Sequence, residues 1–293
     1  MKVSIILPCY NGAGTVGTQL EALAAQRWSA EWQVELIFVD NCCTDSSLQI
    51  LHGYQSRLPN LQIVHASARR SRPYARNVGA QVAMGDVLLF CDADDEVAPG
   101  WLGAMGRALQ THEFVACRFD TTKLNPPWLQ SRGTLQRDGL SRLWYPPYRL
   151  YAGGSSLGIR RSLHEAVGGF DETMPYLEDA EYCLRVQEYT GKELQFVPEA
   201  VVHIRYRATL WAMWVQAYCW GQYNEYLYRR HRHPDGKDRA RWRAYWMEWL
   251  WLLRHLSVFL RYKEGRVHLF WRTGWQMGLL KGCLLYRVPP VSV

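Results

Sequence analysis

The chain has 293 residues, of which 48% are hydrophobic and 21% charged, and its formal net charge is +7 at pH 7. This balance is typical of a globular protein and excludes intrinsic disorder as the default state. No charge-free apolar stretch reaches the roughly 20 residues of a membrane span, and the apolar run at the N-terminus stops at Pro8, which argues against a signal peptide. The eight cysteines are scattered without a CxxC pair. We therefore expect a cytoplasmic protein and no zinc site.

Segments of strand length alternate with segments of helical pattern along the first 111 residues. The predicted strands span residues 3–7, 34–39, 61–65 and 87–91, and the predicted helices span residues 15–26, 45–55, 73–84 and 101–111. The strands are almost wholly apolar rather than alternating, which is typical of a parallel sheet covered on both faces. This order predicts a doubly wound α/β fold, in which ligands bind beyond the carboxyl ends of the strands.

Polar residues follow three of these strands. They are Tyr10-Asn11-Gly12 after the first, Asp40-Asn41 after the second and Asp92-Ala93-Asp94-Asp95 after the fourth. No GxGxxG follows the first strand and no GxxxxGK[ST] is present, which excludes dinucleotide and P-loop sites. Asp92 and Asp94 point to the same side of an extended segment, and two such carboxylates can hold Mg²⁺ or Mn²⁺ against phosphate oxygens. The alternative is a solvated acidic turn before a helix, but the strand-end position favours the metal.

Six segments, in order from Ser4 to Arg185, resemble successive blocks of family-2 glycosyltransferases. They are SIILPCYN (residues 4–11), FVDN (38–41), ARNVG (75–79), the stretch from Gly85 to Asp95, GGFDE (168–172) and EDAEYCLR (178–185). Each block alone is weakly specific, but six in order are strongly specific. The resemblance implies the GT-A fold, which is a Rossmann-like, mostly parallel sheet flanked by helices. It also implies an inverting mechanism and a nucleotide-sugar donor.

The resemblance assigns roles to individual residues of this chain. Pro8, Tyr10 and Asp40 match the nucleobase and ribose pocket, and Arg76 matches a basic residue near the nucleotide. Asp92 matches a carboxylate close to the ribose and the metal, Asp94 matches the carboxylate that binds the metal, and Gly154 matches a position near the donor sugar. Asp179 matches the catalytic base, and His203 matches a histidine that completes the metal shell. The implied cofactor is Mn²⁺ or Mg²⁺. One departure is visible, because Cys43 stands where a small hydroxyl residue is usual, which puts the hydrogen bonding of that loop in doubt.

Each assignment has a simpler structural alternative. The carboxylates of Glu178-Asp179 also suit a helix N-terminus, and Arg76 could solvate its own helix rather than contact a phosphate or base. A single histidine such as His203 is more often a hydrogen-bonded residue than a ligand. Gly154 lies in a Gly-Gly-Ser segment that suits a tight turn. The order of the six blocks favours the functional role for Asp179, and the position carried over from the family favours the role of His203 as a ligand.

Composition changes sharply after Arg205. Residues 1–205 carry 19 basic and 22 acidic side chains, a net charge of −3, whereas residues 206–293 carry 15 and 5, a net charge of +10, together with nine of the 14 tryptophans. We therefore predict a catalytic domain over residues 1–205 and a basic, Trp-rich helical region over residues 206–293. Helical spacing begins at Leu210 and again at Trp242, continuing to Leu260, with a turn at 234–236 between them.

These C-terminal helices have three interpretations. They pack on the catalytic domain, or they form an interfacial platform on an anionic membrane, which tryptophan and arginine together suit. Both can hold at once. A nucleic-acid surface is the third interpretation, but nothing upstream resembles a nucleic-acid module, so no nucleic-acid partner is expected.

The sequence therefore predicts an inverting, metal-dependent glycosyltransferase of glycan biosynthesis. It would move a sugar from a UDP-sugar to a hydroxyl of a saccharide or lipid-linked acceptor, with the metal on the diphosphate and Asp179 as general base. The expected location is the cytoplasm, with peripheral attachment to the inner face of the plasma membrane. Two alternatives stay open, namely a transferase to polyprenyl phosphate, whose acceptor is already ionised, and a non-catalytic nucleotide- or membrane-binding module.

Overall fold

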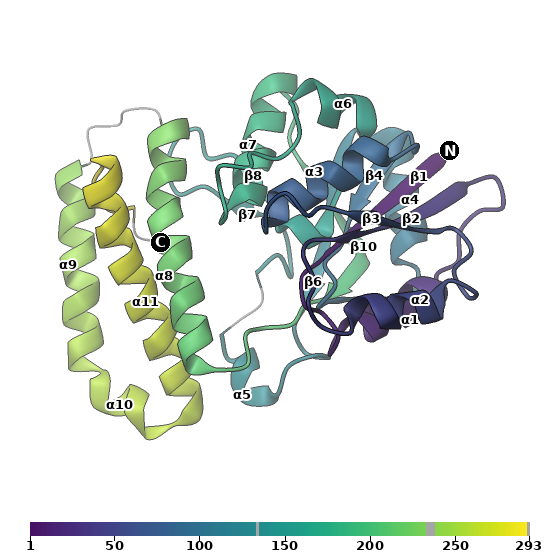
Figure 1. Ribbon diagram of the computed structural model, residues 1–293. Helices are drawn as coiled ribbons and strands as arrows, with labels where there is room; N and C mark the ends of the chain where they lie inside the picture. The colour runs from purple at the N-terminus through teal and green to yellow at the C-terminus, as the bar shows by residue number, and fades with distance from the viewer. Residues whose placement is uncertain (133–134, 233–237, 292–293) are drawn as a thin grey trace. The chain divides into compact units, whose positions relative to one another are not determined.

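The computed structural model describes residues 1–132, 135–232 and 238–291. These residues divide into two compact units (Figure 1). The first comprises residues 1–123, 135–141 and 150–205, and the second comprises residues 124–134, 142–149 and 206–293. The chain passes from one unit to the other between Arg205 and Tyr206, but the second unit also includes two short segments that precede this point.

The described residues of the first unit form one eight-stranded sheet. Its strands are β1 (Lys2–Cys9), β2 (Gln33–Asp40), β3 (Leu61–His65), β4 (Val87–Phe90), β5 (Glu96–Val97), β6 (Phe114–Asp120), β9 (Leu157–Arg160) and β10 (Gln195–His203). They lie in the order β3-β2-β1-β4-β9-β6-β10-β5. Strands β1 to β4 are mutually parallel and β6 is parallel to β10, whereas β9 is antiparallel to both its neighbours and β5 is antiparallel to β10. The predicted α/β class and the mostly parallel sheet are confirmed.

Helices cover both faces of this sheet. They are α1 (Val16–Ala24), α2 (Ser47–Tyr54), α3 (Arg72–Val82), α4 (Trp101–Thr111), α6 (Arg161–Ala166) and α7 (Glu178–Thr190). Neighbouring residues of β1 serve opposite faces, because Ile5 and Leu7 join the apolar core that includes Leu20 of α1, and Ile6 joins the core that includes Tyr182 of α7. This explains why β1 is continuously apolar.

The second unit is helical. Its helices are α5 (Pro127–Gln130), α8 (Leu210–His231), α9 (Asp238–Arg254), α10 (Leu256–Arg261) and α11 (Lys263–Tyr286). Short strands β7 (Ser141–Arg142) and β8 (Leu150–Tyr151) pair where the chain passes between the units. Helices α8 and α11 pack backbone to backbone along a stripe of glycines. A Cβ placed on Gly278 would lie 2.1 Å from the carbonyl oxygen of Tyr218, so only glycine fits this crossing.

The predicted helical pattern of this unit is partly wrong. Helix α8 begins at Leu210 as predicted, but the second predicted helix is interrupted at His255 and forms α9 and α10. Helix α11 was not predicted, because glycines lower helix propensity and the sequence alone does not show that they face another backbone. The turn predicted at 234–236 lies outside the described residues. None of the described helices combines the length and the apolar character that a membrane span requires.

Candidate functional site

The polar segments predicted to meet do lie at one edge of the sheet. Strands β1 and β2 are parallel and in register, with Cys9 beside Asp40, and β4 lies on the other side of β1. Tyr10, Asp40 and the acidic turn after β4 therefore lie at the carboxyl ends of three adjacent parallel strands. This edge is where ligands bind in open α/β sheets.

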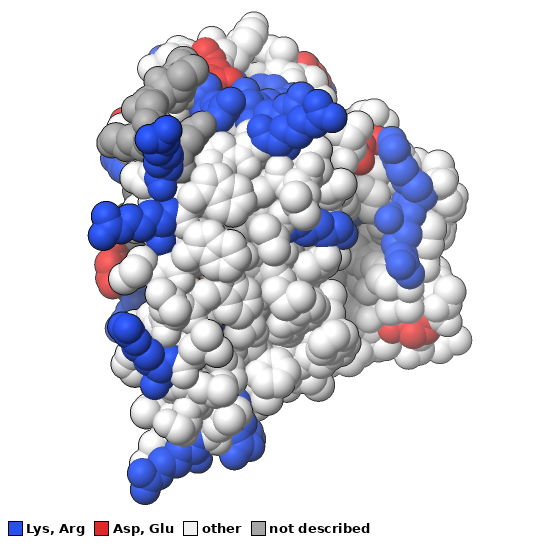
Figure 2. Space-filling view, turned by 90° about the vertical axis from the view of Figure 1, so that its left-hand side faces the viewer, with Lys and Arg blue, Asp and Glu red and all other residues white. Residues whose placement is uncertain are grey.

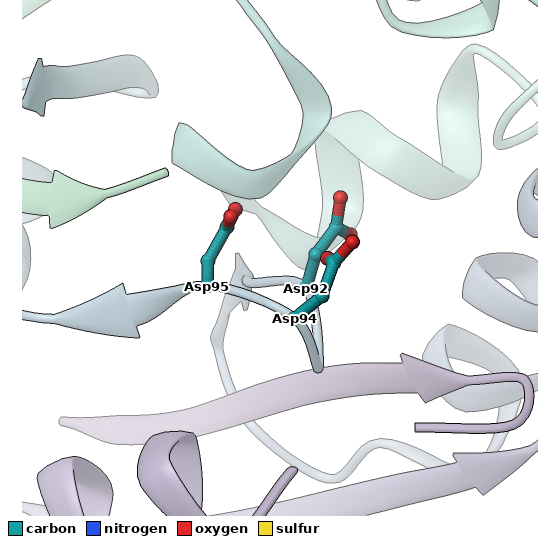
Figure 3. A group of neighbouring side chains, drawn as sticks. All are labelled: Asp92, Asp94 and Asp95. Atoms are coloured by element: carbon teal, nitrogen blue, oxygen red, sulfur yellow. The ribbon is translucent and has the colours of Figure 1, made fainter. Parts of the chain in front are cut away.

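Three aspartates of the turn after β4 form a cluster. One carboxylate oxygen each of Asp92, Asp94 and Asp95 lies within 4.8 Å of the others, and all three side chains rise from the same side of the turn (Figure 3). Among the described residues this is the group of potential metal ligands that the structure brings together. Three hard carboxylate oxygens at this spacing suit Mg²⁺ or Mn²⁺.

Neighbouring groups hold the acidic turn in place. Gln19 donates a hydrogen bond to the carbonyl of Asp92 at 3.1 Å, and Arg205 donates its backbone N–H to Asp95 at 3.0 Å and its side-chain Nε–H to the carbonyl of Asp94 at 3.1 Å. Burial, together with the charges of Asp94 and Asp92, raises the pKa of Asp95 well above its ordinary value. A divalent cation would offset this crowding of negative charge.

Arg76 connects the acidic turn to the start of helix α7. Its side chain is only 1% exposed, and it donates to Asp92 at 2.8 Å and to Glu178 at 2.9 Å. Burial would lower the pKa of Arg76, but Asp92 and Glu178 outweigh burial and raise it. Arg76 thus fixes the orientation of Asp92, and its place near the nucleotide stays a prediction.

Asp179 stands at the first turn of α7 and is held by two backbone amides. Its Oδ2 accepts the N–H of Gly154 at 2.8 Å, and its Oδ1 accepts the N–H of Ala180 at 2.9 Å. A Cβ on Gly154 would lie 2.5 Å from Nη1 of Arg76, so a larger residue here would displace the guanidinium from its ion pairs. Gly154, Arg76, Asp92 and Asp179 are therefore parts of one constellation.

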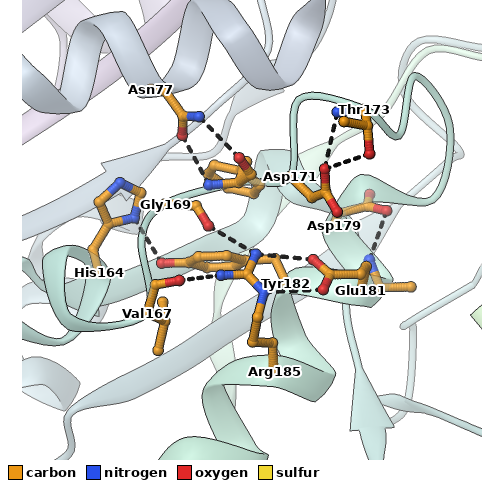
Figure 4. Close-up of polar contacts among 12 residues, drawn as sticks. Asn77, His164, Val167, Gly169, Asp171, Thr173, Asp179, Glu181, Tyr182 and Arg185 are labelled. Carbon is orange, nitrogen blue, oxygen red and sulfur yellow. Dashed lines mark hydrogen bonds and ion pairs between the residues drawn. The ribbon is translucent and has the colours of Figure 1, made fainter. Parts of the chain in front are cut away.

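Polar contacts join α7 to the segment that precedes it in the chain and hold this helix in place (Figure 4). Arg185 forms a bidentate pair with Glu181, at 2.9 Å for both bonds, and donates to the carbonyls of Val167 and Gly169. Asn77 of α3 bonds both the N–H and the C=O of Phe170, at 2.8 and 2.9 Å. The segment between α6 and α7 is thus tied both to α3, which carries Arg76, and to α7, which carries Asp179.

The loop after β2 positions Asp40. Its carboxylate accepts the N–H of Cys43 at 2.9 Å and pairs with Nδ1 of His65 at 2.9 Å. Burial alone would raise the pKa of Asp40, but these two hydrogen bonds outweigh it and lower the pKa. The Sγ of Cys43 accepts the N–H of Asn11 at 3.3 Å, so the cysteine keeps the loop hydrogen-bonded where a hydroxyl residue was expected.

Tyr10 is the exposed aromatic side chain of this edge. Its ring is 45% exposed, its hydroxyl accepts a hydrogen bond from Arg70 at 2.7 Å, and the guanidinium of Arg70 lies 4.7 Å from the ring centroid. Pro8 is buried within β1. An exposed ring at the end of β1 is available for stacking on a planar ligand.

His203 ends β10, and its Nδ1 lies 2.6 Å from Asp120. Burial would raise the pKa of Asp120, but hydrogen bonds from His203 and Thr122 lower it. This pairing leaves Nε2 as the atom for a metal, as in carboxylate–histidine–metal arrangements. His203 is not a member of the three-aspartate cluster, so its role as a ligand remains a prediction.

Comparison with protein-family models matches residues 4–167 to the family described as "Glycosyl transferase family 2". The chain belongs to this family. Escherichia coli (strain K12) YibD, described as an uncharacterized glycosyltransferase, is 38% identical over 98 residues, which are 33% of this chain and 27% of YibD. The poly(ribitol-phosphate) beta-N-acetylglucosaminyltransferase TarS of Staphylococcus aureus (strain Mu50) is 36% identical over 98 residues, 33% of this chain and 17% of TarS. The match thus spans about a quarter or less of these relatives.

Solved glycosyltransferases share the fold. The mannosyltransferase PcManGT of Pyrobaculum calidifontis, in complex with GDP-Man and Mn²⁺, has a TM-score of 0.67 and 18% identity, covering 96% of this chain and 86% of PcManGT. S. aureus TarS 1–349 in complex with UDP-GlcNAc has a TM-score of 0.55 and 18% identity, covering 94% of this chain and 91% of that one. The predicted GT-A fold of this family-2 chain is confirmed.

Two residues that contact or adjoin this constellation had no role in the sequence prediction. Asp95 was read only as part of the acidic run, and its position in the cluster follows from the turn that leads from β4 into β5. Glu178 was read as a helix-start carboxylate, yet it is buried and bonds Arg76. The charged side chain at Arg76, inside a helix that packs on a parallel sheet, was a signal that a buried acid must lie opposite.

Proposed function

We propose that this chain is an inverting glycosyltransferase that moves a sugar from a UDP-sugar to a hydroxyl of a saccharide or lipid-linked acceptor in glycan biosynthesis. The observation that carries the proposal is the link from the aspartate cluster through Arg76 and Gly154 to Asp179. It joins a set of potential metal ligands to a positioned carboxylate within one unit. Family membership, together with structural neighbours in complex with UDP-GlcNAc and GDP-Man, supports a nucleotide-sugar donor.

The aspartate cluster fits a divalent cation. Asp92 and Asp94, joined by Asp95, would hold Mn²⁺ or Mg²⁺ through carboxylate oxygens, and His203 is proposed as a further ligand. When bound, the cation neutralises the charge that develops on the departing diphosphate. Two neighbours, PcManGT and GalNAc-T7, are described with Mn²⁺ bound, which supports this cofactor.

Asp179 is proposed as the general base. Hydrogen bonds from two backbone N–H groups fix its carboxylate. Because a carboxylate has about four lone-pair sites, acceptor positions remain for a hydroxyl. The acceptor oxygen forms a bond to the anomeric carbon while its proton passes to Asp179, and the bond from that carbon to the diphosphate breaks with its electron pair leaving on the diphosphate. One displacement from the opposite face inverts the anomeric carbon.

The nucleotide is proposed to lie against Tyr10 and Asp40. Stacking on the exposed ring of Tyr10 and hydrogen bonding to the ionised Asp40 would hold the base and ribose. Pro8 precedes Tyr10 in the chain and would shape the floor of this pocket.

The test is thermal unfolding of the full chain with UDP or GDP, each with and without Mn²⁺. A nucleotide at 100 times its dissociation constant stabilises a protein by about 2.7 kcal/mol. We expect UDP with Mn²⁺ to raise the melting temperature most. If neither nucleotide changes the melting temperature under any condition, the proposed function is wrong, and if only GDP does, the proposed donor is wrong.

We also propose that the second unit attaches the chain to the anionic inner face of the plasma membrane. The net charge of +10 over residues 206–293 supports this, since each basic residue near an anionic surface contributes about 1 kcal/mol. Co-sedimentation with phosphatidylglycerol vesicles should fall as salt rises, and absence of co-sedimentation even at low salt would exclude the attachment.

A further inference from the structure

Helix α9 carries apolar side chains both where it packs and where it is exposed. Tyr245 and Leu252 are seven residues apart and point into the second unit, where they are 0% and 3% exposed. The opposite side of a surface helix is normally polar. In α9 the side turned away from the packed residues carries Met247, and its flank carries Trp246 and Leu253; these side chains are 53%, 56% and 65% exposed.

Helix α10 continues this surface. Its sequence is LSVFLR, yet none of its residues is buried. Leu256, Val258 and Leu260 are all exposed, so the helix adds apolar area to the surface and almost none to the core. We call the exposed apolar side chains of these two helices the docking face; they are Trp246, Met247, Leu250, Trp251, Leu253, Leu256, Val258 and Leu260.

Basic side chains surround the docking face. Between residues 239 and 266 the exposed basic residues are Arg239, Arg243, Arg254, Arg261, Lys263 and Arg266, and the exposed acidic residue is Glu264. Glu248 of α9 is paired with Arg272. Figure 2 faces the side on which α9 lies and shows a broad uncharged area with blue side chains along its edge and little red. Contiguous apolar surface of this kind marks an interaction site.

We propose that the docking face inserts into the interfacial region of an anionic lipid bilayer, with α9 and α10 lying in the plane of the surface. Exposed tryptophans with leucines between arginines suit the boundary between headgroups and acyl chains. This inference rests on the proposed membrane attachment and names the surface and the kind of contact, which is apolar insertion in addition to charge attraction.

Charge complementarity favours a bilayer over a second copy of the chain. A symmetric dimer places the same patch on both partners, so the six exposed basic residues would face six like charges with one acid on each side. Anionic headgroups neutralise the same residues. A bilayer also accepts aromatic and aliphatic side chains together without the shape complementarity that a protein interface needs.

The experiment measures partition of the full chain into vesicles of phosphatidylcholine with phosphatidylglycerol. Leu253→Glu changes the docking face, and Met84→Glu is the matched control, because Met84 is 68% exposed and lies in the first unit. Both variants make the same change in net charge. We expect Leu253→Glu to weaken partition about 10-fold, equivalent to about 1.4 kcal/mol, and Met84→Glu to leave it close to wild type.

Circular dichroism and thermal unfolding verify that each variant folds, and Trp246→Gln replaces Leu253→Glu if that variant does not. Equal partition of the docking-face and control variants would overturn the proposal while leaving membrane attachment in place. Suppose instead that wild type does not bind vesicles but dimerises in sedimentation equilibrium, and that Leu253→Glu abolishes the dimer. This result would assign the docking face to a second copy of the chain. Failure of wild type to bind vesicles would remove the membrane attachment itself. Nucleotide binding is measured separately and is unaffected by any of these outcomes.

Discussion

The two units use their side chains in opposite ways. In the first, a charged residue as large as Arg76 lies 1% exposed with a carboxylate on each side, and the parallel strands are buried on both faces. In the second, glycines bring α8 and α11 together, while leucines and tryptophans of α9 and α10 face outward. Polar groups inside and apolar groups outside both depart from the usual rule. Each departure marks the place where the unit is expected to meet a ligand or a surface.

The largest effect is expected at Asp179. Asn keeps the shape of the side chain but cannot take a proton from the acceptor, and loss of a general base costs about 10²–10⁴-fold in rate. We expect Asp179→Asn to bind UDP as wild type does and to transfer sugar more slowly by this factor. Turnover on a hydroxyl acceptor near the wild-type rate would remove Asp179 from the mechanism. Full activity on a phosphate acceptor alone would favour the polyprenyl-phosphate alternative.

The glycine contact of the second unit comes next. Gly278→Ala places a Cβ 2.1 Å from a backbone oxygen of α8, and overpacking of this kind costs about 1–3 kcal/mol or more. Gly53→Ala in α2 is the matched control, because a Cβ there meets nothing within 4 Å. Urea unfolding should show a lower midpoint for Gly278→Ala and an unchanged or higher one for Gly53→Ala. Equal stability of the two variants would contradict the backbone contact.

Arginine-to-lysine substitutions should cost more stability at a buried ion pair than at an exposed one. Arg76→Lys cannot reach both Asp92 and Glu178, and a lost hydrogen bond between charged groups costs about 1.5–3 kcal/mol. Arg69→Lys affects a pair with Glu172 in which Arg69 is 53% exposed, where the cost is about 0–1 kcal/mol. Both are measured by chemical unfolding, together with Mn²⁺ dependence of UDP binding. Arg76→Lys that changes neither quantity would contradict a structural link from Arg76 to Asp92 and Glu178.

The last effect concerns pH. Burial raises the pKa of Glu225 in α8 to about 8, whereas the pKa of a glutamate in an unfolded chain is about 4.3. Between these values the folded chain holds a proton that the unfolded chain lacks, so Glu225 makes stability fall as pH rises toward 8. Glu225→Gln removes this dependence. We expect its melting temperature to exceed that of wild type by a few degrees at pH 8 and to match it at pH 4.

The features predictable from the sequence were those that depend on local hydrophobic pattern and on the residues at strand ends. Continuous apolar runs such as 87–91 identified the buried parallel strands, and the order of polar segments after them located the edge where Asp40 and Asp92 lie. Two elements matched residue for residue, the strand β3 and the helix α4.

Other features depend on tertiary contacts that no local pattern encodes. Strand β9 (Leu157–Arg160) is antiparallel to both neighbours, a direction that its four residues do not reveal. Arg76 and Glu178 are 102 positions apart, so their pairing depends on how α3 and α7 pack. The exposure of α9 stayed one of the open interpretations for a related reason: leucine and tryptophan at helical spacing do not distinguish the face that packs from the one that remains uncovered.

The central claim is that the aspartate cluster links a divalent cation to the donor nucleotide. Its most direct test is calorimetric titration of UDP with and without Mn²⁺ into wild type, Asp94→Ala and Asp138→Ala. Asp138, whose side chain is 90% exposed and outside the cluster, is the matched control. We predict that Mn²⁺ strengthens UDP binding to wild type and Asp138→Ala but not to Asp94→Ala, with all three chains folded. Unchanged Mn²⁺ dependence in Asp94→Ala would contradict the account.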